Sequence, residues 1–64
     1  MNTNSIRLTK DGDTILFELC GTGHKEGWIT FYDAKGIAWL PTLYPLSHLL
    51  GSIASRIKDG WTVV

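Results

Sequence analysis

The sequence is poor in several features that would point to a function by themselves. It holds one cysteine and two prolines in 64 residues, and six basic residues balance six acidic ones, for a formal net charge of zero. One cysteine cannot form an internal disulfide bond. Because the sequence also shows no apolar leader segment, we expect the protein to reside in the reducing cytoplasm. Balanced charge argues against non-specific nucleic-acid binding, which needs surplus lysine and arginine, and against an acidic DNA mimic.

Long apolar runs are also missing. The most apolar stretch, residues 37–57, is interrupted by two prolines, a histidine and an arginine, so it does not predict a membrane span. The composition, 44% hydrophobic and 11% aromatic, is nevertheless too apolar for a disordered segment. We therefore expect one small domain over residues 5–64, which follows a frayed polar N-terminus over residues 1–4.

Two turn signals organise the first two thirds of the chain. Asp11-Gly12 lies between alternating segments, which is typical of a two-residue hairpin loop, and this loop puts Leu8 opposite Ile15. A second turn over residues 33–36 pairs Phe31 with Trp39 in a fourth strand over residues 37–40, which Pro41 ends. Phe31 and Trp39 are expected to face the same side of the sheet as the apolar residues of the first hairpin.

A helix is predicted after Pro45, which suits a first helical turn, and Gly60 is its expected stop. Five apolar residues recur there at helical spacing: Leu46, Leu49, Leu50, Ile53 and Ile57. The sequence thus predicts an α+β fold, an antiparallel β-sheet of two hairpins (four strands) with one C-terminal helix packed on one face. Residues 61–64 are β-prone, and a short fifth strand there is left open.

Two surfaces are candidates for contact with a partner. The helix side opposite the apolar stripe carries small or neutral residues where a solvated face normally carries charges, and these are His48, Gly51, Ser52 and Ser55. The sheet face away from the helix carries Trp28, Tyr32 and Leu16, which one helix on the other face cannot cover. The alternatives are a poorly optimised surface helix, and a face covered by the chain's own loop and tail.

Residue types that can carry chemistry are present but scattered: Cys20, His24, Glu26 and His48. Structural zinc usually needs two closely spaced ligand pairs, and a cysteine nucleophile needs a base and an orienting group. The glycine-rich loop over residues 21–27 precedes a predicted strand, whereas phosphate loops precede helices. We predict no catalytic residue, no metal and no cofactor, and keep a small Cys/His hydrolase or metal protein as an alternative.

The leading hypothesis is a non-catalytic protein–protein interaction module in the cytoplasm, not an enzyme. It would act as an accessory subunit, adaptor or inhibitor of a larger protein, and as a homodimer. Inhibitors encoded by phages and mobile elements are often of this size, which is an analogy only. The second hypothesis is a nucleic-acid-binding sheet that stacks bases on Trp28 and Tyr32, although few basic residues accompany these rings. No membrane partner is expected.

Overall fold

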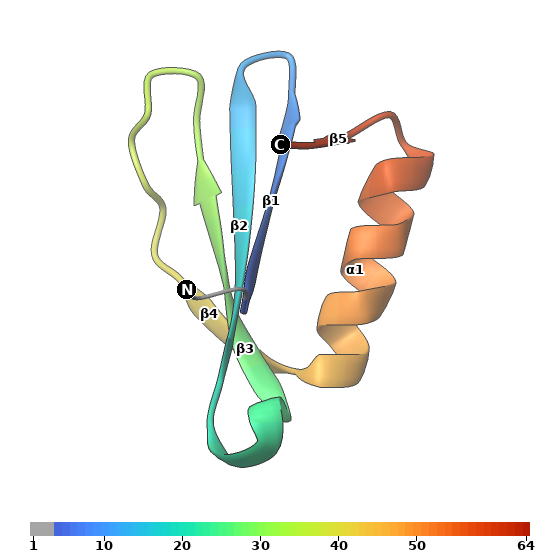
Figure 1. Cartoon of the computed structure of the whole chain (residues 1–64). Coiled ribbons are helices and arrows are strands. Elements are labelled where there is room, and N and C mark those ends of the chain that lie inside the picture. Colours follow the sequence, from blue (N-terminus) through green and yellow to red (C-terminus); the bar gives the residue numbers. More distant parts are fainter. Residues whose placement is uncertain (1–3) are drawn as a thin grey trace.

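An antiparallel sheet of five strands carries one helix against one of its faces (Figure 1). The computed structural model describes residues 4–64. Along the chain the elements are β1 (Ser5–Lys10), β2 (Asp13–Cys20), a 3₁₀ turn η1 (Thr22–His24), β3 (Glu26–Tyr32), β4 (Thr42–Pro45), α1 (Leu46–Lys58) and β5 (Thr62–Val63). The strand order is β4-β3-β2-β1-β5. The predicted α+β fold is confirmed, and residues 62–63 supply the fifth strand.

The hairpin of β1 and β2 has the predicted register. Asp11 and Gly12 have φ values of 53° and 89°, as a two-residue turn of type I′ requires, and Leu8 lies opposite Ile15. The backbone oxygen of Asn4 accepts a hydrogen bond of 2.8 Å from the Leu19 N–H, so the ladder begins at Asn4. Residues 1–3 of the expected frayed end lie outside the described residues.

The second hairpin corrects the expected fourth strand. Tyr32 lies opposite Ala38, as expected, but Ile29 lies opposite Thr42, so the register changes by one residue between these pairs. The extra residue falls at Leu40-Pro41, opposite Thr30, which is a β-bulge. Regular pairing therefore begins after Pro41, and the strand covers residues 42–45 instead of 37–40.

The helix begins and ends where the sequence indicates. Pro45 precedes the first turn in an extended conformation, and at the C-terminal end the N–H groups of Gly60 and Trp61 bond the carbonyls of Ile57 and Arg56 at 3.1 and 3.0 Å. Gly60 has a φ of 101°, which completes a Schellman motif and confirms the predicted stop. Within residues 4–64, no helix has the length and apolar character needed to cross a membrane.

The core is small. Four side chains are exposed by 2% or less, and these are Leu8, Ile15, Phe17 and Leu49. Around them lie the half-buried residues Ile6, Leu19, Ile29, Phe31, Tyr44, Ile53 and Trp61. Three residues of the predicted helical stripe do not join this cluster: Leu46, Leu50 and Ile57. The helix thus buries only part of its apolar stripe against the sheet.

Candidate functional site

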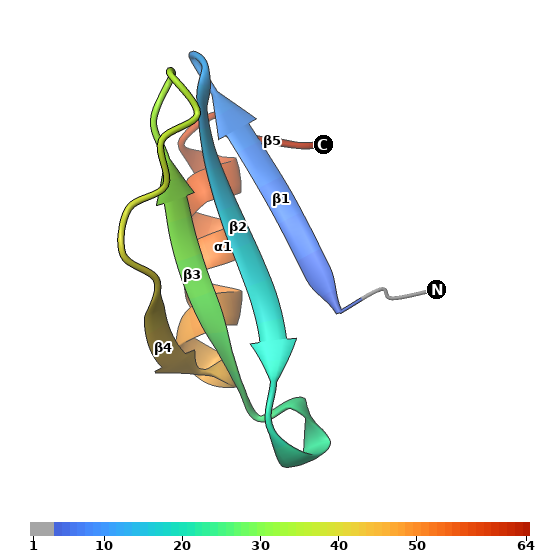
Figure 2. The ribbon, with the colours of Figure 1, turned by 90° about the vertical axis from the view of Figure 1, so that its left-hand side faces the viewer.

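The path of α1 leaves part of the sheet uncovered. The helix follows directly on β4 at one edge of the sheet, and its C-terminal turn leads into β5 at the other edge (Figures 1 and 2). It therefore crosses the sheet from edge to edge. The N-terminal half of β1, which is far from β5, lies to one side of the helix instead of beneath it (Figure 2).

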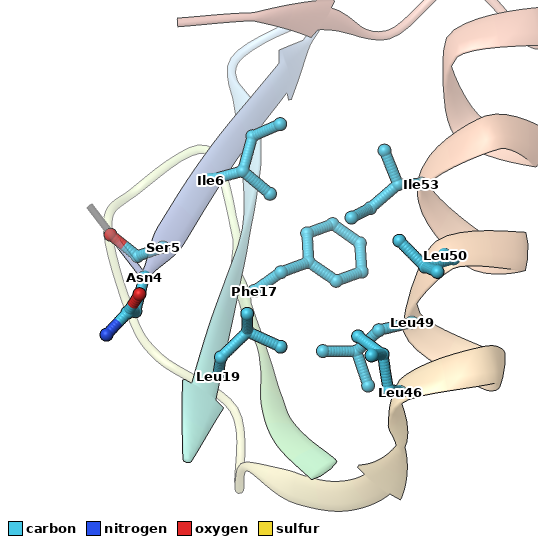
Figure 3. A pocket seen from close by; sticks show the side chains of 9 residues that line it. All are labelled: Asn4, Ser5, Ile6, Phe17, Leu19, Leu46, Leu49, Leu50 and Ile53. Atoms are coloured by element: carbon cyan, nitrogen blue, oxygen red, sulfur yellow. The ribbon is translucent and has the colours of Figure 1, made fainter. Parts of the chain in front are cut away.

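A cavity of about 140 Å³ opens at this place, and we call it the α1–β1 groove (Figure 3). Leucine and isoleucine side chains from α1 face apolar side chains from the two strands across it. The lining residues are Asn4, Ser5, Ile6, Phe17, Leu19, Leu46, Leu49, Leu50 and Ile53. None of these side chains is ionisable. A dry cavity of about 150 Å³ holds one benzene, so the groove has room for one apolar side chain.

The rim of the groove is an exposed apolar flank of α1. Leu49 points into the core with 1% of its surface exposed, whereas Leu50 at the rim is 58% exposed. Ile57, which lies two helical turns from Leu50 on the same side, is 48% exposed. Apolar area of this kind on a small domain marks a contact surface more often than isolated exposed residues do.

The edge of β1 next to the groove has free backbone groups. Leu19 donates to Asn4, so alternation along the antiparallel ladder turns the N–H and C=O of Ser5 away from β2. On that outer side, β5 pairs only with Leu8 and Thr9, and one further bond of 2.9 Å joins the Val64 N–H to the Arg7 carbonyl. Among the described residues, the outward groups of Ser5 have no hydrogen-bond partner.

The opposite edge of the sheet is protected. The Leu46 N–H bonds the Lys25 carbonyl, and the same alternation makes Leu43 and Pro45 the outward positions of β4. Proline has no N–H, so Leu43 alone keeps an outward donor in this strand. Prolines at an edge are a common protection against unwanted strand pairing.

The predicted helix residues lie away from the groove. The ring of His48 stacks on Tyr44 with centroids 4.2 Å apart, and Gly51 and Ser55 are exposed. Ser52 is half-buried. At about 100° per residue, Ser52 and Ser55 fall on the flank of α1 opposite Leu50. Their role in partner binding stays a prediction.

The predicted sheet residues share the face opposite the helix, as expected. Trp28 is 39% exposed, and Tyr32 and Leu16 are half-buried. Tyr32 also lines a shallow, more polar cleft of about 330 Å³ between the two hairpin turns, together with Arg7, Gly12, Thr14, Asp33, Ala34 and Gly36. This face combines one arginine with two aromatic rings, which is less positive charge than single-strand binders use.

Of the four scattered chemical residues, the structure places Cys20 and Glu26 next to each other, as cross-strand neighbours. His24 is exposed in η1, and His48 stacks on Tyr44 of β4. Over residues 4–64, no group of three or more His, Cys, Asp or Glu side chains is arranged to hold a metal ion.

Sequence reasoning missed the groove and a second exposed apolar segment. Trp39 makes an edge-on contact with Phe31 but remains 63% exposed, and Leu40 at the bulge is 91% exposed. The one signal for the groove is Leu50, which lies at one margin of the helical stripe, about 100° from Leu49 at the other margin.

Comparison with known proteins adds no relative. No protein-family model, no curated protein and no solved structure matches this chain. Any function therefore has to be argued from the residues and their geometry.

Proposed function

We propose that this chain is a non-catalytic protein-interaction module, and that the α1–β1 groove receives an apolar side chain of the partner. The observation that carries the proposal is Leu50, 58% exposed on the rim of a cavity without ionisable lining. In the cytoplasm such a module would serve as an accessory subunit, adaptor or inhibitor of a larger protein.

The chemistry of the groove favours a protein over other partners. Nucleic acids present phosphates, which need cations, and the lining of the groove has none. An apolar pocket that accepts one anchoring side chain is a common centre of protein interfaces. Complete burial of one leucine-sized side chain contributes about 1.5–3 kcal/mol, so the partner must make further contacts for stable binding.

The test uses two charge substitutions on the same helix. Leu50→Lys places an ammonium group at the rim of the groove, and Ile57→Lys is the matched control, because Ile57 is similarly exposed but does not line the groove. Short peptides selected from a random library against the unmodified chain serve as probes in fluorescence polarisation. We expect Leu50→Lys to weaken their binding at least tenfold, and Ile57→Lys to leave it within about twofold.

Equal binding to both lysine variants would contradict the proposal, as would selected peptides that lack an apolar anchor. The homodimer expected from the sequence stays a separate prediction. Sedimentation velocity at high micromolar concentration tests it, since a monomer there would exclude a stable dimer.

A further inference from the structure

We infer that the partner binds as an extended segment, which pairs with the open edge of β1 at Ser5 and places an apolar side chain in the α1–β1 groove. The inference rests on the proposed function and specifies the form of the partner. Its first support is that the backbone groups of Ser5 point outward without a partner in residues 4–64, while Ser5 itself lines the groove. An unpaired strand edge is the usual template for an added strand.

Strand geometry fixes which side chain enters the groove. Side chains alternate along β1, so Ile6 points into the groove, whereas Ser5 lies at its border and turns its side chain away from α1, to the other face of the sheet (Figure 3). A partner residue bonded directly opposite Ser5 would also point to that other face. Its neighbour, opposite Ile6, would point into the groove. The partner segment should therefore carry an apolar residue at the position opposite Ile6. At the neighbouring position, opposite Ser5, any side chain should be tolerated.

The size of the groove argues for a short segment and against a second copy of the chain. A stable dimer would need an interface of standard size, about 800 Å² on each partner, which is roughly a sixth of the 4562 Å² surface of this chain. The groove, with a volume of about 140 Å³, has room for one side chain and supplies only a small part of such an interface. A docked helix would need a longer groove with anchors over several turns. A strand needs one pocket together with backbone hydrogen bonds.

At one end of the free edge, β5 limits the length of the added strand. β5 occupies the outer side of β1 at Leu8 and Thr9, and the Val64 bond to Arg7 extends this cover by one residue. The added segment therefore lies in line with β5. The edge of β4 also keeps one outward N–H, that of Leu43, but no residue of β4 lines the groove, so a strand added there would not place a side chain in it.

The experiment removes the outward N–H of Ser5 and leaves the hydrogen bonds between β1 and β2 in place. Ser5→Pro deletes an N–H that faces away from β2, and proline is tolerated at such edge positions. Ser5→Ala is the matched control, because it changes the side chain and keeps the donor. The probes are synthetic peptides of alternating threonine and one central leucine, phenylalanine or aspartate, measured by two-dimensional NMR titration.

We expect the leucine and phenylalanine peptides to shift the amide signals of Ser5 and Ile6, and the aspartate peptide to bind at least tenfold more weakly. Ser5→Pro should weaken binding of the apolar peptides at least tenfold, and Ser5→Ala should stay within about twofold. Peptides with N-methyl groups on the backbone should lose binding to the unmodified chain. This last measurement decides the question if Ser5→Pro does not fold.

The possible failures are distinguishable. If Leu50→Lys abolishes peptide binding while Ser5→Pro and N-methylation leave it unchanged, strand pairing is overturned and the groove still binds side chains. If none of these changes affects binding, the proposed function fails as well. A dimer in sedimentation, with groove signals that change on dilution, would identify a second copy as the occupant and overturn the inference.

Discussion

Leu49 and Leu50 are identical neighbours on α1 with opposite surroundings. Leu49 is 1% exposed between the sheet and the helix, and Leu50 is 58% exposed at the rim of the α1–β1 groove. One step of about 100° around the helix separates the closed core from the open flank. The comparison teaches that this domain closes its core with one strip of the helix and leaves the adjacent apolar strip exposed to solvent.

The largest effect is expected when Leu49 and Leu50 are each replaced by alanine. Leu49→Ala should lower the free energy of unfolding by about 2–5 kcal/mol, because it removes buried methyl groups and leaves a cavity. Leu50→Ala should lower it by less than about 1 kcal/mol, since more than half of that side chain already contacts water. Urea unfolding followed by tryptophan fluorescence measures both. Equal losses would show that the two strips are not distinct.

A second test adds a group to the closed region. A Cβ atom on Gly27 would lie 2.5 Å from the Glu18 carbonyl oxygen and 2.6 Å from Leu49 Cδ2. Gly27→Ala should therefore cost about 1–3 kcal/mol, as overpacking of a core usually does. Chemical denaturation gives the value. Stability equal to that of the unmodified chain would mean that both the backbone of β2 at Glu18 and the Leu49 side chain can shift to make room.

The third test makes the same substitution on the open side. Gly51 lies in the middle of α1, and a Cβ atom there meets nothing within 4 Å. Gly51→Ala should raise stability by about 1 kcal/mol through helix propensity alone. Thermal unfolding by circular dichroism measures the gain. Together with Gly27→Ala, it provides a pair in which one added methyl group has opposite effects on the two sides of the helix.

The smallest expected effect belongs to the charge substitution at the rim. Leu50→Lys should change the free energy of unfolding by less than about 0.5 kcal/mol, because the lysine head can remain in water. Equilibrium unfolding checks this. A loss above about 2 kcal/mol would place Leu50 in the core, and reduced peptide binding by this variant would then be a folding effect.

The first hairpin was predictable because two independent signals agree on it. Asp11-Gly12 specifies a turn type that fixes the register, and the alternation around Leu8 and Ile15 selects the same register. The second hairpin has only its turn, where the Asp33 carboxylate accepts the N–H groups of Lys35 and Ile37 at 2.9 and 3.0 Å. Pro41 beyond that turn is compatible with a bulge as well as with the end of a strand, so the sequence alone does not distinguish the two.

The helix illustrates a different limit of prediction. Periodicity identifies the apolar stripe and Gly60 identifies its end, but neither says how much of the stripe the sheet can reach. That depends on the angle at which α1 crosses the strands, which is set by the connections to β4 and β5. Leu50 was therefore expected in the core, and the groove beside it was not foreseen. The roles of Trp28 and Ser55 remain predictions.

The pairing of β5 with β1 has a consequence for the order of folding. Leu8 of β1 lies opposite Val63 of β5, more than fifty residues further along the chain, whereas the two hairpins form from neighbouring segments. Closing so long a loop costs entropy before any contact rewards it. We expect the outermost strand to join late, after the hairpins have formed, so that its amide protons exchange with solvent sooner than those of β2.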